Sequence, residues 1–149
     1  ANEKPDNAVR VVSEETSHAM RQLLRLAVTH GTGSNAEVGG YWVGGKTGTA
    51  EKVGPNGYDR RRVLSSFVGV FPITGPRYLV LAMLDEPKGT PSTHGYATGG
   101  WTAAPVVARV IARVGPMVGI TPIVKAQISN DFPTTVIKLD GNEFRLAAY

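Results

Sequence analysis

Residues 44–52 read Gly-Gly-Lys-Thr-Gly-Thr-Ala-Glu-Lys, and the interpretation of the whole sequence starts from them. Positions 44–49 hold three glycines, two threonines and one lysine. Glycine lets a ligand come close to the backbone, while lysine and threonine offer positive charge and hydrogen-bond donors without an acid or a thiol. The stretch is therefore suited to holding an anion.

One motif that fits is the nucleotide-binding P-loop, because residues 40–47 read Gly-Tyr-Trp-Val-Gly-Gly-Lys-Thr. In a P-loop, backbone N–H groups cradle phosphates between a buried strand and a helix that opens at the Lys-Thr pair. Here residues 31–35, Gly-Thr-Gly-Ser-Asn, form a loop where the buried strand should be. After Thr47 come Gly48, Gly54 and Pro55, which would break a helix. The context disfavours nucleotide binding.

A second interpretation makes residues 41–52 a strand, because aromatic and β-branched residues favour extended structure. Successive side chains of a strand alternate between its faces, so Lys46 would point one way and Thr47 and Thr49 the other. This pattern is similar to the Lys-Thr-Gly box of penicillin-binding proteins and serine β-lactamases. An ordinary glycine-rich edge strand without a ligand would carry the same residues, so the surrounding sequence has to decide.

Composition excludes several classes of protein. The chain has 149 residues, 42% of them hydrophobic, which is enough for one ordinary globular core. The net charge is +4, but the one basic cluster, residues 60–62, lacks the interleaved aromatic side chains of a nucleic-acid surface. No cysteine is present, which excludes a disulfide scaffold, a cysteine–zinc site and a thiol nucleophile. No apolar run approaches the ~20 residues of a membrane span, and we expect neither metal nor cofactor.

The first predicted element is an amphipathic helix that Ser13 caps and that Gly31 ends near His30. Glu14 and Glu15 lie in its first turn, where the helix dipole favours acids. Its apolar residues recur with helical spacing and predict one buried stripe: Met20, Leu23, Leu24, Ala27 and Val28. We expect His18 and His30 to be surface or cap residues.

Three strands are predicted next, at residues 41–52, 63–71 and 77–84, with connections short enough for an antiparallel meander. In the second strand, Phe67, Gly69 and Phe71 share one face. The third strand is apolar nearly throughout and is expected to be buried on both faces. At its end, adjacent Asp85 and Glu86 should face opposite sides and be solvated.

A glycine-rich loop then leads to a second helix, with Thr102 as its cap, Pro105 in its first turn, and Gly115-Pro116 at its end. Its apolar stripe is predicted to contain Val106, Val107, Val110, Ile111 and Val114. Residues 1–121 are interpreted as one unit, and residues 122–149 as a tail with a short hairpin at Asp140-Gly141. The fold class is α+β, an antiparallel sheet flanked by helices.

This order of elements carries a specific resemblance. From residue 9 to about 115, the chain resembles the C-terminal part of the transpeptidase domain of class B penicillin-binding proteins. The run from Asp85 to Trp101 is most similar to the division-type enzymes that build septal peptidoglycan, as opposed to the elongation type. The matching stretches are Gly31-Thr32-Gly33, Gly45-Lys46-Thr47-Gly48-Thr49-Ala50, Ser66-Phe67-Val68-Gly69, Leu84-Asp85-Glu86-Pro87 and Ala103-Ala104-Pro105.

The resemblance implies a mechanism in which a serine of a Ser-x-x-Lys motif attacks the D-Ala–D-Ala end of a stem peptide. An amine of a neighbouring peptide then resolves the acyl-enzyme, and β-lactams acylate the same serine. Lys46 would supply positive potential beside the nucleophile, and Thr47 and Thr49 would hold the terminal carboxylate. The Thr49 N–H would be an oxyanion donor, a kind of contact worth ~3 kcal/mol of barrier. Gly48 would let the substrate lie against the strand edge.

The sequence departs from the family pattern in one important respect. It contains no Ser-x-x-Lys and no Ser-x-Asn motif, and it starts at Ala1. We therefore expect the C-terminal fragment of a longer enzyme, inactive alone and competent with the N-terminal part that carries both motifs. The resemblance implies that the partners are peptidoglycan stem peptides, β-lactams and division-complex proteins, and that nucleic acid is not one of them. It also implies a location at the periplasmic face of the inner membrane. The alternatives are a non-catalytic peptide- or partner-binding module on the same sheet and, more distantly, the P-loop.

Overall fold

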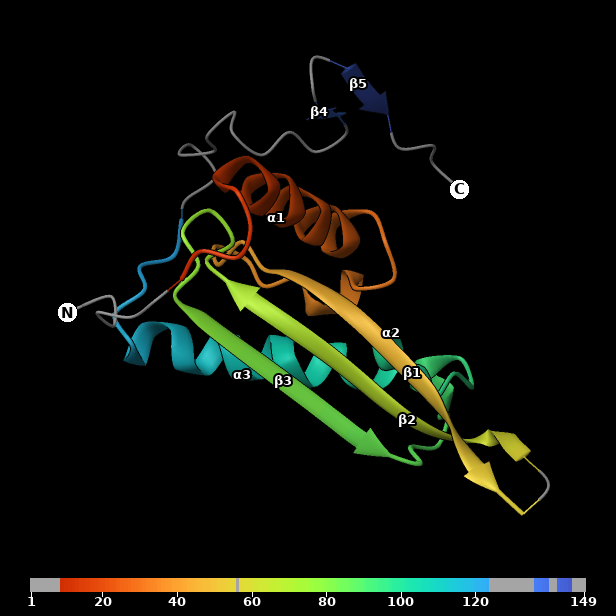
Figure 1. Cartoon of the computed structure of the whole chain (residues 1–149). Helices are drawn as coiled ribbons and strands as arrows, with labels where there is room; N and C mark the ends of the chain where they lie inside the picture. The colour runs from red at the N-terminus through yellow and green to blue at the C-terminus, as the bar shows by residue number, and fades with distance from the viewer. Residues whose placement is uncertain (1–8, 56, 124–135, 140–141, 146–149) are drawn as a thin grey trace.

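The computed structural model of the chain describes residues 9–55, 57–123, 136–139 and 142–145 (Figure 1). It contains three α-helices, two short 3-10 helices and five strands within these ranges. In chain order they are α1 (Glu14–Thr29), η1 (Ser34–Ala36), β1 (Gly44–Gly54), β2 (Gly57–Phe71), β3 (Tyr78–Asp85), η2 (Pro91–Thr93), α2 (Gly99–Thr102), α3 (Ala104–Met117), β4 (Val136–Leu139) and β5 (Asn142–Arg145).

The first three strands form an antiparallel sheet in the order β1-β2-β3, so the predicted meander and the α+β class are confirmed. Lys46 lies opposite Val68, and Val68 lies opposite Leu81 in the next strand. The hairpin of β1 and β2 continues past the end of β3 and projects from the sheet (Figure 1).

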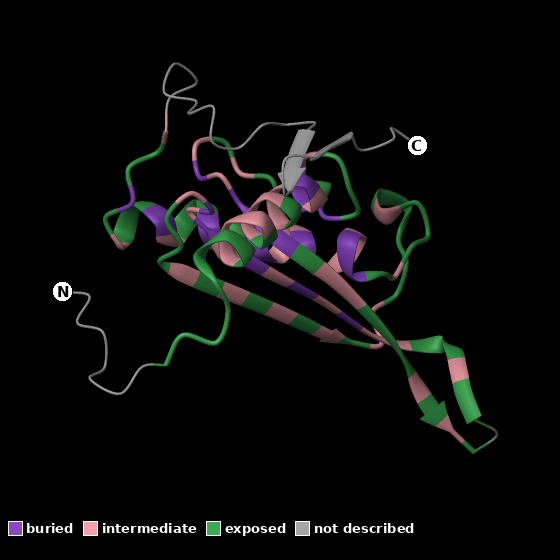
Figure 2. Ribbon diagram, turned by 45° about the horizontal axis from the view of Figure 1, so that its top comes forward, coloured by how far each residue is buried: buried purple, intermediate pink, exposed green. Residues whose placement is uncertain are grey.

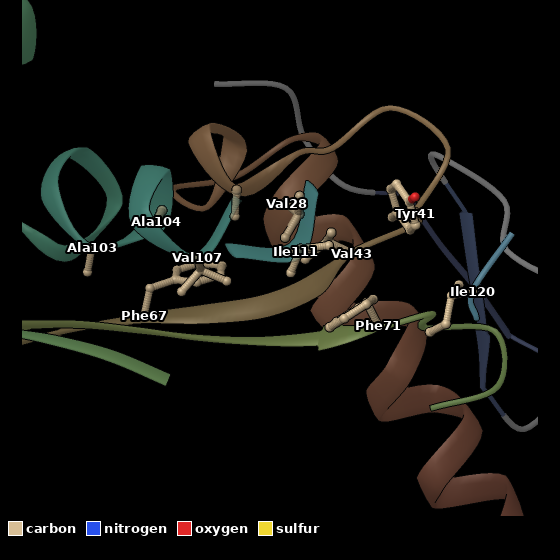
Figure 3. Packing of buried hydrophobic residues seen from close by; sticks show 11 residues of the cluster. Val28, Tyr41, Val43, Phe67, Phe71, Ala103, Ala104, Val107, Ile111 and Ile120 are labelled. Carbon is tan, nitrogen blue, oxygen red and sulfur yellow. The ribbon is translucent and has the colours of Figure 1, made fainter. Parts of the chain in front are cut away.

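The core lies between the sheet and α3, which crosses one face of the strands. Phe67 and Phe71 of β2 are fully buried, as are Val107 and Ile111 of α3. In Figure 3 the ring of Phe67 points from the sheet toward Val107. The shared face of Phe67, Gly69 and Phe71 is thus confirmed, because alternate residues of β2 point into this core.

Helix α1 begins as predicted, with the Ser13 Oγ accepting a hydrogen bond from the Thr16 N–H, and His30 ends it. Its predicted stripe is only partly correct. Val28 is buried, together with the unpredicted Leu26, whereas Met20 and Leu23 are exposed. The reason is that α1 packs on β1 at the edge of the sheet, so only its C-terminal turns reach the core.

Strand β1 begins at Gly44, three residues later than predicted. Trp42 has a φ of 37°, a left-handed conformation that cannot continue a strand. Its carbonyl accepts a hydrogen bond from the Ile73 N–H at 2.8 Å, and the Arg25 guanidinium lies 5.6 Å from its ring. Tertiary contacts therefore hold Trp42 in a bend in spite of its preference for extended structure.

The prediction that β3 is buried on both faces is wrong. Its residues alternate along the strand, and Leu79, Leu81 and Met83 are 63%, 56% and 57% exposed (Figure 2). Helix α3 covers the other face, where Val80, Ala82 and Leu84 pack against the core. An apolar run in the sequence does not by itself show whether one face or both faces of the strand are buried.

The second predicted helix is two helices in the structure. Thr102 is not a cap but the last residue of α2, where its hydroxyl donates to the Thr98 carbonyl at 2.9 Å. Helix α3 follows with Pro105 in its first turn, as predicted, and continues through Pro116 to Met117. Its fully buried residues are Ala104, Val107, Ile111 and Gly115, whereas Val106, Val110 and Val114 are half-buried.

Strands β4 and β5 pair antiparallel, with Val136 opposite Arg145. The predicted turn at Asp140-Gly141 lies outside the described residues, and the division of the chain after residue 121 stays a prediction. Among the helices that the structure describes, none has the length and apolar character needed to cross a membrane.

Candidate functional site

Lys46 reaches the threonine side of β1 although its backbone position faces the other way. Its Nζ donates to the Thr47 carbonyl at 2.9 Å and lies 3.4 Å from the Thr47 Oγ1. The four-carbon side chain of lysine is long enough to bend round an edge strand. The alternation predicted by the sequence thus describes the Cβ positions, while the ammonium itself lies beside Thr47.

Thr47 is joined to a loop that the sequence analysis did not include in the site. The hydroxyl oxygens of Thr47 and Thr32 are 3.0 Å apart. Thr32 belongs to the loop after α1 and lies in the Gly-Thr-Gly stretch that is similar to the family. That similarity could have identified Thr32 as a site residue. Lys46, Thr47 and Thr32 therefore form a continuous chain of polar contacts.

Thr49 is oriented from the opposite side of the cleft. Its Oγ1 accepts a hydrogen bond from the N–H of Gly99, the first residue of α2, at 3.2 Å. Because this oxygen is already an acceptor, the hydroxyl proton of Thr49 is left for another acceptor. A Cβ at position 99 would overlap the Ser66 carbonyl and lie 2.6 Å from the Gly48 carbonyl, so only glycine fits there.

Two further side chains hold the loop that carries Gly99. Asn35 Nδ2 donates to the Gly100 carbonyl at 2.9 Å. The hydroxyl of Ser65, which is fully buried, donates to the Ala97 carbonyl. No sequence pattern indicated either contact, because each joins residues more than 30 positions apart.

A cleft of about 590 Å³ lies between the loop after α1, the Lys-Thr-Gly strand and α2. The polar side chains of the lining carry hydroxyl, amide and imidazole groups, and none of the described lining residues has a carboxylate. Of the predicted site residues, the structure brings Thr47 and Thr49 into this cleft and attaches Lys46 through Thr47, whereas Gly48 contributes no lining atom. The lining residues are His30, Gly31, Thr32, Ser34, Asn35, Thr47, Thr49, Thr98, Gly100 and Trp101.

The Trp101 side chain lines the cleft, and two further rings pack against it. The rings of Trp101 and Tyr96 are stacked with centroids 5.7 Å apart, and the His94 ring meets Trp101 edge-on at 5.1 Å. His30, which ends α1 as predicted, also lies on the cleft lining. An anion with an apolar portion suits this combination of hydroxyl groups, a nearby ammonium and an aromatic wall.

An ion cluster fixes β1 a short distance beyond the box. Lys52 Nζ lies 2.8 Å from Asp85 Oδ1 and 2.9 Å from Glu86 Oε1, and Arg62 Nε lies 2.9 Å from the same Glu86 oxygen. The prediction that Asp85 and Glu86 face opposite sides is wrong, because β3 ends at Asp85 and Glu86 turns with a φ of 47°.

This cluster shifts the acid–base behaviour of its members. The hydrogen bonds that Lys52 donates, first to Asp85 and then to Glu86, raise the pKa of Lys52. Hydrogen bonds first from Lys52 and then from Arg62 lower the pKa of Glu86. The cluster is partly exposed, lies outside the cleft lining and joins β1, β2 and the residue after β3, so its role is to hold these strands together.

The P-loop interpretation fails on the observed backbone. Lys46 and Thr47 lie inside strand β1, and no helix opens at them. Backbone N–H groups of a helix N-terminus, which a P-loop needs to cradle phosphates, are therefore missing at this lysine.

Comparison with known proteins agrees with this geometry. Residues 2–112 match the family described as the penicillin binding protein transpeptidase domain. The chain is 48% identical over 120 residues to the probable peptidoglycan D,D-transpeptidase FtsI of Caulobacter vibrioides, covering 74% of the chain and 20% of that relative. It therefore spans about a fifth of that relative's length.

Two solved structures have the same fold. The transpeptidase domain of penicillin-binding protein 3 from Burkholderia pseudomallei, in its apo form, superposes with a TM-score of 0.66 at 34% identity, covering 82% of this chain and 37% of that one. Penicillin-binding protein 3 from Mycobacterium tuberculosis, complexed with ampicillin, superposes with a TM-score of 0.67 at 29% identity, covering 80% and 28%.

Proposed function

The chain belongs to the penicillin-binding protein transpeptidase family, and we propose that it forms the Lys-Thr-Gly wall of the active site of a peptidoglycan D,D-transpeptidase. The recognition of a C-terminal transpeptidase part of a division-type enzyme is confirmed. The observation that carries the proposal is that Thr47 and Thr49 line one cleft, with the Lys46 ammonium beside Thr47 and no carboxylate among the described lining residues.

The substrate group that this wall would bind is a terminal carboxylate. Thr49 has an oxygen engaged by the Gly99 N–H and a proton to donate, and Thr47 lies between the Lys46 ammonium and Thr32. Two hydroxyl donors next to one cation fit a carboxylate, because charge-assisted hydrogen bonds are shorter and stronger than neutral ones. The D-Ala–D-Ala end of a stem peptide and the carboxylate of a β-lactam both offer this group.

The edge of β1 would hold the rest of the substrate. This strand pairs with β2 on one side, and within the described residues no strand pairs with its other side. The Thr47 carbonyl is within reach of the exposed ammonium on that open side. Alternate residues of a strand direct their backbone groups the same way, so the Thr49 N–H would lie along the same edge as an oxyanion donor. Gly48, without a side chain, would leave room for a substrate strand.

The nucleophile would come from a different part of the protein. A serine in a Ser-x-x-Lys motif, backed by a Ser-x-Asn motif, would attack the carbonyl carbon of the penultimate D-Ala and form an ester as the C–N bond breaks. The serine proton would pass to the departing D-Ala amine. An amine of a second stem peptide would then attack the ester, form the cross-link and return the proton to the serine. Lys46, next to this centre, would stabilise negative charge as it develops.

The setting of the reaction follows from the same proposal. The matched relative is by name a peptidoglycan enzyme, so the reaction would take place outside the cytoplasm, on the periplasmic face of the inner membrane. The protein part with the two serine motifs would be the first partner, and division-complex proteins would be further partners. Residues 1–121 would be the portion that belongs to the transpeptidase domain.

Native mass spectrometry with benzylpenicillin tests the proposal. This chain should gain no penicilloyl adduct alone, and an added polypeptide with the two serine motifs should gain one only when this chain is present. Lys46→Ala should lower the rate of adduct formation by about 10²-fold or more, the size of effect known for one electrostatic contact to a transition state. Lys88→Ala, which removes an exposed lysine from the loop after β3, is the matched control. An adduct on this chain itself, or equal rates for the two variants, would contradict the proposal.

A further inference from the structure

The hairpin of β1 and β2 forms an arm that the proposed active site does not use. Strand β3 stops opposite Leu64, so residues 52–54 pair with residues 57–59 and not with a third strand. Figures 1 and 2 show the arm projecting from the body of the protein. The cross-strand pair Val53 and Tyr58 is 70% and 75% exposed. Exposed apolar side chains on a two-stranded projection are a feature of interaction surfaces.

Three arginines interrupt the pairing at the base of this arm. Glu51 pairs with Val63 and Lys52 pairs with Asp59, so residues 60–62 have no partner in β1. The ordinary bulge adds one residue to a strand, and bulges at sheet edges redirect side chains. Here the inserted residues are all arginine, and the Arg61 N–H is anchored to Asp59 Oδ1 at 2.9 Å.

Two of the three guanidinium groups are available to a ligand. Arg62 is held by Glu86 at 2.9 Å. The side chains of Arg60 and Arg61 are 90% and 92% exposed, and their ion pairs with Glu51 and Asp59 measure 3.7 Å and 3.5 Å, which is long for such a contact. A guanidinium with its donors in water is a ready partner for a carboxylate, which it can bind with two parallel hydrogen bonds.

The neighbouring strand edge points to the shape of that ligand. Strand β2 pairs with β3 only from Leu64 onward, and the Glu86 N–H closes this ladder on the Val63 carbonyl at 2.9 Å. Within the described residues, no strand lies along the outer edge of residues 57–62. An open edge next to exposed arginines offers backbone hydrogen bonds and charge to an added strand.

We propose that this arm, residues 52–54 and 57–63, is a docking site for an extended acidic segment of a partner protein, which adds as a strand to the outer edge of β2. Its carboxylates would bind Arg60 and Arg61, and an apolar side chain would cover Tyr58. A polypeptide is favoured over a lipid surface because only a polypeptide can use the open backbone edge. It is favoured over a nucleic acid because the arm has one aromatic side chain and no stacking series.

The test uses the 149-residue chain and a fluorescein-labelled peptide of alternating glutamate and valine, with binding measured by fluorescence anisotropy. The double variant Arg60→Gln/Arg61→Gln should weaken binding about tenfold or more, the effect of losing two charge-assisted contacts. The double variant Arg109→Gln/Arg113→Gln removes the same charge from exposed positions of α3 and should leave binding unchanged. Circular dichroism of both variants checks that the fold is retained.

Two other probes separate the alternatives. A peptide with the same side chains but N-methyl groups at alternate positions cannot pair with the strand edge, and it should lose most of the affinity. A lysine–valine peptide should not bind. Any one of three results would overturn the proposal. The first is that the methylated peptide binds as tightly as the unmethylated one, and the second is that the α3 variant loses as much affinity as the Arg60→Gln/Arg61→Gln variant. The third result is arginine-dependent binding of phosphatidylglycerol vesicles without binding of the peptide.

Discussion

Replacing Gly99 by alanine should disturb the cleft from behind, through the backbone that orients Thr49. The added Cβ would overlap the Ser66 carbonyl and lie 2.6 Å from the Gly48 carbonyl. Both of these atoms are strand backbone, which cannot rotate away as a side chain can. The first turn of α2 must therefore move outward, and its hydrogen bond from Gly99 to Thr49, now 3.2 Å, must lengthen or break.

The magnitude follows from two terms. Forcing a methyl group into a well-packed position costs about 1–3 kcal/mol, and a lost hydrogen bond adds about 1 kcal/mol. The free energy of unfolding should thus fall by roughly 2–4 kcal/mol, which urea denaturation followed by circular dichroism can measure. Gly75→Ala is the matched control, because nothing lies within 4 Å of a Cβ built there. If the two variants unfold within about 0.5 kcal/mol of each other, the packing argument for Gly99 is refuted.

Four shorter predictions concern the core, the two sides of the ion cluster and the cleft. Phe67→Ala should lower the free energy of unfolding by about 3–5 kcal/mol in urea, because the ring is fully buried against α3. Since the pKa of Glu86 is lowered in the folded state, its contribution to stability is complete above the ordinary pKa of 4.5 and is lost as pH falls through the lower folded value. The stability of the protein should therefore fall more steeply below pH 4.5 than that of Glu86→Gln. Since the pKa of Lys52 is raised, its contribution is complete below 10.5 and is lost as pH rises through the higher folded value, which thermal unfolding of Lys52→Met at alkaline pH can check. Thr32→Val should weaken binding of a D-Ala–D-Ala-terminated peptide, measured by NMR titration, while leaving the urea midpoint nearly unchanged, and the opposite pattern would show that the threonine is structural.

The outcome for α1 shows what helical periodicity can predict. Its limits, from the Ser13 cap to His30, follow from local chemistry: a hydroxyl that accepts an N–H, acids in the first turn, and a glycine after the end. Its buried face does not follow from the same pattern. Met20 and Leu23 have the spacing of a core stripe and are nonetheless exposed, because the direction of a helix on its sheet is set by other segments.

For the candidate site, too, the sequence predicted some residues and not others. Lys46, Thr47 and Thr49 could be named in advance, since an anion requires such donors and the box holds them within four positions. Thr32, Asn35 and Ser65 could not be assigned roles from spacing, because their partners lie at Thr47, Gly100 and Ala97. Only a fold that closes the loop after α1 against α2 brings these groups together.

By itself, the sequence determined the elements whose causes are local: the capped helix, the strand meander with its buried phenylalanine face, the Lys-Thr-Gly box and the family to which the box belongs. The tertiary structure decided everything that depends on which surfaces meet. It bent Trp42 out of the strand, left one face of β3 exposed, gathered Asp85 and Glu86 on Lys52, and turned the Lys46 ammonium toward Thr47. The physical reason is that hydrogen bonding within a turn or a helix acts over a few residues, whereas packing and charge pairing act between residues that only the fold makes neighbours.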